Sequence, residues 1–205
     1  MGDMLKLINH PYPVGTPGLA ILTAGGILFF LALLRSRHAA SGGPGAAAAR
    51  RSTASILGVL LQMLGFFAVG LGRIAPTLPP TGPAAILQAA IVAVLMIVCV
   101  SLFVAATRAM GRNWSVVARM RSDHELVTEG VFAHLRHPIY VGMALFLFAL
   151  ALAFGHMANL ALGVPLFLLG TWIRVHEEEK LLRAQFGGAF DDYAARVKRF
   201  LPGII

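Results

Sequence analysis

The residues that could do chemistry in this chain are concentrated in two short polar segments, residues 124–140 and 174–179. In the first segment, Pro138 favours the start of a helix, because its missing N–H costs nothing at that position. The free backbone N–H groups at a helix start attract a carboxylate or a phosphate. Arg136 and His137 add hydrogen-bond donors directly beside that start. The first segment therefore predicts a site for an anionic group.

The second segment should lie next to the first. Two apolar runs, residues 138–154 and 157–173, are joined only by Gly155-His156, which predicts a tight antiparallel hairpin. Each run has 17 residues, so at about 1.5 Å per residue the chain returns to its starting depth. Residues 136–137 and 174–178 should then lie side by side at one membrane edge.

The charges of the second segment complement those of the first. Glu177 and Glu178 offer negative charge that suits an ammonium or sulfonium group, so the two segments together fit a zwitterion such as an amino acid moiety. Each residue also has a simpler interpretation. Arg174 and Glu178 could form an i,i+4 ion pair, Arg136 could mark membrane topology, and Tyr140 could be an interfacial anchor. Their joint placement at one corner favours the functional interpretation, because ionisable groups that face a membrane bundle are functional candidates.

The elements that position these segments are predicted to be membrane helices. Hydrophobic residues make up 58% of the 205 residues and charged residues only 13%, whereas soluble domains carry about 25% charged residues. Five apolar runs approach the length of about 20 residues that a span requires. These predicted spans are residues 18–34, 56–71, 85–106, 138–154 and 157–173. A polar tail helix is expected over residues 177–197, with a break at Gly187-Gly188. The fold class is therefore an all-α membrane bundle in one domain, residues 1–205.

The distribution of basic residues predicts the orientation of the bundle. Fifteen of the 17 lysines and arginines lie in the tail and in the connections on its side, and only Lys6 and Arg73 lie opposite. Since cytoplasmic loops carry the excess of Lys and Arg, we expect the N-terminus outside and the C-terminus in the cytoplasm. The short connections favour a prokaryotic inner membrane. Trp114 is expected at the headgroup level.

Several classes of site are not expected. The net charge of +8 comes from short connections without a basic stripe of interleaved aromatics, so no nucleic-acid partner is predicted. The single cysteine, Cys99, excludes an intrachain disulfide, and no Cys/His spacing typical of zinc occurs. No metal site is therefore expected.

The two polar segments resemble a known family. Residues 124–142, HELVTEGVFAHLRHPIYVG, resemble the cofactor motif of isoprenylcysteine carboxyl methyltransferases and their bacterial and archaeal relatives. Phospholipid N-methyltransferases share a similar arrangement. Residues 174–203 resemble the same proteins, so the resemblance covers about the last 80 residues in the expected order and spacing.

This resemblance implies a helical membrane fold whose cytoplasmic end, residues 124–205, encloses S-adenosylmethionine. The residues that it assigns to the cofactor are His124, Glu125, Leu126, Val127, Phe132, His137, Pro138, Ile139, Tyr140 and Glu178. Residues 137–140 match the HPxY element of the family, and Arg174 matches an arginine that holds a substrate carboxylate. Phe132 stands where the family commonly has tyrosine, so the hydroxyl for one cofactor hydrogen bond is missing.

The predicted reaction is methyl transfer to a lipophilic acceptor that arrives from the bilayer. Arg174, Arg136 and Glu177 are the candidate catalytic residues. A carboxylate acceptor needs no base, whereas an amine would need one, for which Glu177 or Glu178 are candidates. Arg174 favours the carboxylate. A phospholipid amine methyltransferase, a nicotinamide-dependent membrane reductase and a non-catalytic protein of the same fold remain the alternatives.

Overall fold

The computed structural model describes residues 11–40, 50–51, 53–111, 114, 119–120 and 125–204. Five long helices dominate this part of the chain and coincide with the five predicted spans. They are α2 (Thr16–Ala40), α3 (Thr53–Gly70), α4 (Pro83–Met110), α5 (Pro138–Phe154) and α6 (Leu160–Phe186). Shorter elements are η3 (Gly130–Ala133), η4 (Met157–Asn159) and α7 (Gly188–Arg196). The prediction of an all-α membrane bundle is confirmed.

Length and apolar composition allow α2, α3, α4 and the η4–α6 helix to cross a membrane. α5 is equally apolar but has 17 residues, which gives about 26 Å along its axis against a hydrocarbon core of about 30 Å. Large apolar side chains such as Phe67, Ile97 and Trp172 are exposed on the outer faces of the bundle. Lipid rather than water would cover these faces, because exposed apolar patches of this extent are rare in soluble monomers.

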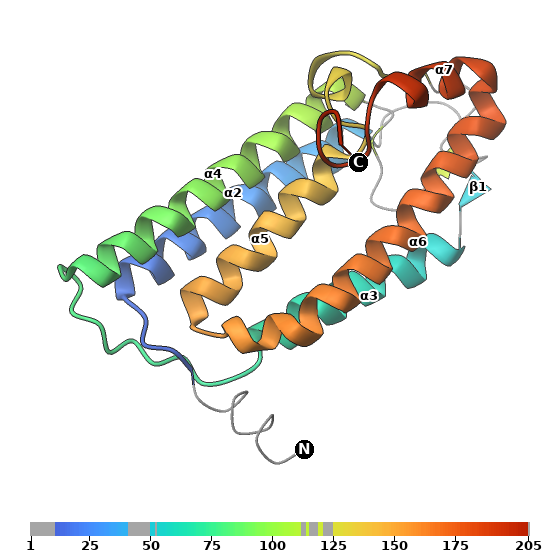
Figure 1. Cartoon of the computed structure of the whole chain (residues 1–205). Helices are drawn as coiled ribbons and strands as arrows, with labels where there is room; N and C mark the ends of the chain where they lie inside the picture. The colour runs from blue at the N-terminus through green and yellow to red at the C-terminus, as the bar shows by residue number, and fades with distance from the viewer. Residues whose placement is uncertain are drawn as a thin grey trace.

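The helices pack in two groups, as Figure 1 shows. α2 lies along α4, α3 lies along α6, and α5 runs between them and packs mainly on α4. The α5–α6 turn is as short as predicted, with Gly155 in the left-handed region at φ +74°. The expected tight hairpin is wrong, however, because α6 packs on α3 and only slightly on α5.

A seam of glycines explains why α6 prefers α3. A Cβ atom added at Gly65 would lie 2.8 Å from the carbonyl oxygen of Gly163, and one added at Gly170 would lie 2.5 Å from that of Gly58. The two backbones are therefore in direct contact, as small residues permit between membrane helices. At the far end of the seam, the Asn159 amide donates to the Leu71 carbonyl at 2.8 Å and so caps α3.

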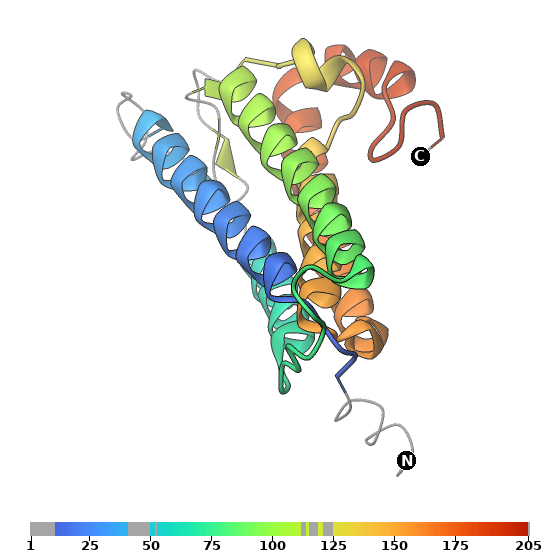
Figure 2. The ribbon, with the colours of Figure 1, turned by 90° about the vertical axis from the view of Figure 1, so that its left-hand side faces the viewer.

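Most of the polar elements of the chain lie at one end of the bundle. Figure 2 shows η3, α7 and residues 197–204 gathered at one end of the helices. α6 continues without interruption from its span to Phe186, so the predicted boundary between span five and a tail helix is wrong. The predicted break at Gly187 is confirmed, and α7 follows it. One two-residue antiparallel pair, β1 (Arg50–Arg51) with β2 (Arg119–Met120), links two connections at this end.

Candidate active site

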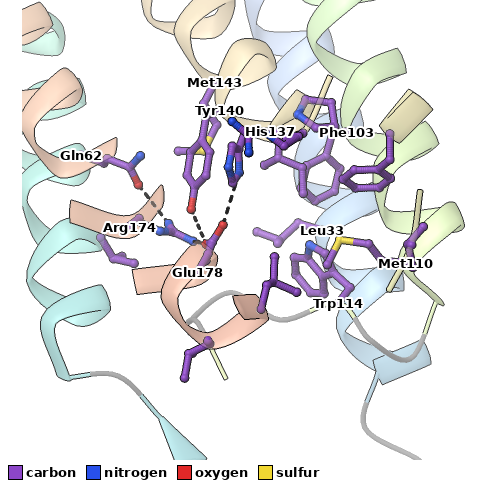
Figure 3. Close-up of a pocket in the computed structure, with 18 of the residues that line it drawn as sticks. Leu33, Gln62, Phe103, Met110, Trp114, His137, Tyr140, Met143, Arg174 and Glu178 are labelled. Atoms are coloured by element: carbon purple, nitrogen blue, oxygen red, sulfur yellow. Dashed lines mark hydrogen bonds and ion pairs between the residues drawn. The ribbon is translucent and has the colours of Figure 1, made fainter. Parts of the chain in front are cut away.

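A cavity of about 500 Å³ lies at the polar end of the bundle, within the range of small-molecule sites of roughly 300–1,000 Å³. Its walls come from α2, α3, α4, α5, α6 and α7. Figure 3 shows a polar wall formed by α5 and α6 and an apolar wall formed by residues such as Leu33 and Phe103. The cavity can therefore hold a ligand with a charged part and an aliphatic part.

The predicted site residues largely converge on this cavity. Those that line it are Glu125, Leu126, Val127, Phe132, Arg136, His137, Pro138, Ile139, Tyr140, Arg174 and Glu178. Glu177 is not among the lining residues in the described part of the chain, and its carboxylate lies 4.0 Å from the Lys180 ammonium. His124 lies outside the described residues. Trp114 is buried and lines the cavity, where its ring lies against that of Phe103.

Glu178 is the acidic centre of the polar wall. The Tyr140 hydroxyl donates a short hydrogen bond to Glu178 Oε1. His137 Nδ1 lies 3.7 Å from Glu178 Oε2, and an Arg174 nitrogen lies 3.7 Å from Oε1. The Glu178 side chain keeps 26% exposure, so its carboxylate remains accessible to a cationic group in the cavity. The predicted proximity of the two polar segments is thus confirmed.

Arg174 is the basic centre of the same wall and is held from three sides. Its Nη1 donates to Gln62 Oε1 at 2.9 Å, and its Cζ lies 5.1 Å from the centre of the Tyr140 ring. A guanidinium over an aromatic face is stabilised by the ring quadrupole. A Cβ atom at Gly58 would lie 2.5 Å from Arg174 Cγ. The aliphatic part of the Arg174 side chain therefore fits against α3 only because residue 58 is glycine.

A second ion network lies beside the first and is centred on Glu179, which is 4% exposed. Arg199 donates to its two carboxylate oxygens at 2.9 and 2.6 Å. His137 Nε2 lies 3.1 Å from Glu179 Oε1, and Arg136 Nη1 lies 3.5 Å from the same oxygen. Glu179 thereby fixes the ring of His137 from the side opposite Glu178.

The backbone completes this network. The Arg136 N–H donates to the Lys198 carbonyl at 2.9 Å, and the His137 N–H donates to the Arg199 carbonyl at 3.0 Å. We call residues 198–200 the C-terminal clasp. The hydrogen bonds from Arg199 to Glu179 raise the pKa of the Arg199 guanidinium, whereas burial lowers the pKa of Arg136, and the Glu179 carboxylate opposes that decrease. The Glu179 carboxylate therefore stabilises the positive charge of both arginines.

Four residues of these networks were not predicted from the sequence: Gln62, Glu179, Arg199 and Thr171, whose hydroxyl accepts a hydrogen bond from the Gln62 amide. Gln62 could have been noticed, because it is an amide within an apolar span, and polar groups inside membrane segments are functional candidates. Glu179 is the third of three consecutive glutamates, and i,i+4 spacing from Arg174 selects Glu178 instead. Its pairing with Arg199 depends on the fold of the tail.

Comparison with known proteins finds methyltransferases that are similar to this chain in sequence. Residues 87–189, about half of the chain, match the model of the family described as phospholipid methyltransferase. The chain is 31% identical over 98 residues to a protein-S-isoprenylcysteine O-methyltransferase of Schizosaccharomyces pombe. The aligned region covers 45% of this chain and 40% of that protein. It is 34% identical over 96 residues to the enzyme of the same name from Tribolium castaneum, and this alignment covers 45% of this chain and 33% of that protein.

The chain thus spans less than half of the length of these two relatives. A solved structure of the eukaryotic intramembrane Ras methyltransferase ICMT aligns with a TM-score of 0.48 and 22% identity, over 73% of this chain and 52% of that chain.

Proposed function

The chain belongs to the phospholipid methyltransferase family, and we propose on that premise that it transfers a methyl group from S-adenosylmethionine to a lipophilic acceptor. The observation that carries the proposal is that Glu178 and Arg174 open onto one cavity with a largely apolar lining. The cavity draws its walls from both halves of the chain, which supports a single domain. The family match also favours methyl transfer over a nicotinamide-dependent reduction.

The residues of the polar wall fit S-adenosylmethionine. When bound, this cofactor supplies an electrophilic methyl group on a sulfonium. Glu178 would accept hydrogen bonds from the amino group of the cofactor. Among the described residues, Arg136 Nε is buried without a hydrogen-bond partner, and together with the start of α5 it offers donors to the cofactor carboxylate. Leu126, Val127 and Phe132 would pack against its apolar parts.

An anionic acceptor agrees best with the rest of the cavity. A carboxylate needs no general base, and Arg174 offers it a charged hydrogen-bond donor. An amine acceptor would have to lose a proton, but Glu177 lies away from the lining and Glu178 already accepts a hydrogen bond from Tyr140. The relatives are isoprenylcysteine O-methyltransferases by name, which supports a carboxylate on a lipidated cysteine or a similar isoprenoid acid as the acceptor.

The cavity also favours an acceptor that enters from the bilayer. Met63 lines the cavity and is 62% exposed on the outer apolar face of α3, so the apolar wall continues to the lipid-facing surface. Catalysis would then consist of aligning the acceptor with the methyl group and excluding water. The distribution of Lys and Arg supports a cytoplasmic position for the cavity end. Short connections favour a prokaryotic inner membrane, whereas the relatives named above are eukaryotic.

The proposal is tested by calorimetry of S-adenosylmethionine and S-adenosylhomocysteine on the protein purified in mild detergent. Glu178→Ala should weaken binding about 10- to 150-fold, because a hydrogen bond to a charged group contributes roughly 1.5–3 kcal/mol. Asp191→Ala is the control, since Asp191 is exposed and pairs with Arg183 outside the cavity. A folded wild-type protein that binds neither compound would refute the proposal.

A further inference from the structure

We infer that Gln62 is a positioning residue that aims the Arg174 guanidinium at an anionic acceptor group and preserves its attraction for that group. The inference rests on the proposed function and extends it to the choice between acceptor classes. Gln62 belongs to α3, outside the residues 87–189 that match the family model.

The direction of two hydrogen bonds fixes the orientation of the Gln62 amide. Gln62 is 1% exposed, and its Oε1 accepts from Arg174 Nη1 at 2.9 Å. Its Nε2 donates to Thr171 Oγ1 at 2.8 Å. Because arginine has only donors, the amide oxygen must face Arg174, and the Thr171 hydroxyl holds the amide in this orientation. Figure 3 shows Gln62 reaching from α3 across to Arg174 on α6.

The side chains of Gln62 and Arg174 have little free space around them. A Cβ atom at Gly58 would lie 2.5 Å from Arg174 Cγ, and one at Gly170 would lie 2.9 Å from Gln62 Cγ. Both side chains therefore run along glycine backbone in the closest part of the α3–α6 contact. This confinement removes alternative rotamers, so the Gln62–Arg174 hydrogen bond fixes one direction of the guanidinium.

Gln62 contacts Arg174 without neutralising its charge. Gln62 is neutral, and it makes a closer contact with Arg174 than the carboxylate of Glu178 does, at 2.9 Å against 3.7 Å. Glu178 is moreover shared with the Tyr140 hydroxyl and with His137. A carboxylate at position 62 would neutralise Arg174 at hydrogen-bond distance, whereas the amide holds it and leaves its positive charge to attract an acceptor anion.

Other residues of α3 also contribute to the cavity wall. Val59, Met63 and Phe66 lie on α3 around Gln62 and line the apolar part of the cavity. One helix would therefore contact the aliphatic chain of the acceptor and set the arginine that receives its anionic end. This combination recognises an anion carried on an isoprenoid or acyl chain.

The test is Gln62→Glu, a change of nearly equal size. The acceptor is N-acetyl-S-farnesylcysteine, and its neutral carboxamide serves as a competitive inhibitor. We expect the KM for the carboxylate to rise about 10- to 100-fold, as expected for loss of a charge-assisted hydrogen bond. The inhibition constant of the carboxamide and the Kd for S-adenosylmethionine should stay within about twofold, because the carboxamide has no negative charge for Arg174 to attract and Glu178, not Arg174, would bind the cofactor amino group. Equal weakening of carboxylate and carboxamide would show a merely structural role and overturn the inference, as would an unchanged KM.

A second pair of variants covers the case in which Gln62→Glu does not fold. Thr171→Val keeps the shape of the side chain but removes the hydroxyl that orients Gln62, so the carboxylate KM should rise about two- to tenfold. Thr171→Ser keeps the hydroxyl and should retain the wild-type KM. Equal values for both variants would refute the positioning role. A wild-type protein that binds S-adenosylmethionine but does not methylate this acceptor would instead refute the proposed acceptor class.

Discussion

Replacement of Glu179 by glutamine should release the C-terminal clasp and disorder one side of the cofactor site. Glu179 is 4% exposed and carries the negative charge that Arg199, Arg136 and His137 surround. The glutamine side chain has nearly the same shape but no charge. The clasp is also held by two backbone hydrogen bonds, from Arg136 and His137, and by the ring contact of Phe200 with His137, but this carboxylate carries its ionic attachment.

The free energy lost in Glu179→Gln can be derived from the burial of the two ion-pair partners, Glu179 and Arg199. Removing one member of a buried ion pair costs about 3–5 kcal/mol. The Arg199 side chain is 37% exposed, so water recovers part of its charge once the pair is broken. We therefore expect a loss of about 2–3 kcal/mol. Since about 1.4 kcal/mol corresponds to a factor of ten, the clasp should open about 30- to 150-fold more often.

Hydrogen exchange measures this opening directly. The N–H groups of Arg136 and His137 donate to the clasp, and their exchange should accelerate by the same factor in Glu179→Gln. Asp191→Asn is the matched control, because it removes an exposed carboxylate that pairs with Arg183 in the same region and should cost about 0.2–1 kcal/mol. Wild-type exchange at both amides in Glu179→Gln, or equal acceleration in the two variants, would refute the role of Glu179.

Two further predictions concern the basic centre and the helix seam. Arg174→Ala should abolish methyl transfer while the Kd for S-adenosylmethionine stays near the wild-type value. Arg35→Ala, at an exposed position of α2, is the control and should leave both quantities unchanged. Parallel loss of binding and turnover in Arg174→Ala would contradict a substrate role. Gly163→Ala should lower the free energy of unfolding by about 1–3 kcal/mol, because the new Cβ would lie 2.3 Å from Val69 Cγ2. Gly188→Ala, where nothing lies within 4 Å, is its control in thermal unfolding, and equal Tm values would contradict the close seam.

The spans and the meeting of the two polar segments could be predicted because they follow from local rules. Apolar run length defines membrane helices, and a two-residue turn brings Arg136-His137 back to Arg174–Glu178. The partner of α6 could not be predicted in this way. Four glycines at matching positions favour α3, and this preference separates α5 from α6 and opens the cavity.

The positioning of the charged side chains likewise depends on distant parts of the chain. Gln62 is 112 residues from Arg174, and Arg199 reaches Glu179 only after the chain has turned at Gly187. Periodicity within a segment contains no information about such pairs. The choice of Glu177 as a candidate base reflects this limit, since the sequence does not show which of two adjacent glutamates faces the cavity, whereas in the structure Glu178 and not Glu177 lines it.

The glycine seam between α3 and α6 has a consequence for how this molecule could diversify. The matched region begins at residue 87, after α2 and α3, yet these two helices contribute six cavity residues: Phe29, Leu33, Val59, Gln62, Met63 and Phe66. A new α3 that keeps the glycines could dock on an unchanged α6 and present different side chains to the ligand. Acceptor preference could then drift by exchange of one helix, while the residues proposed to hold the methyl donor stay in place. A transplanted α3 would then change which acceptor is bound without changing the residues proposed to bind the methyl donor.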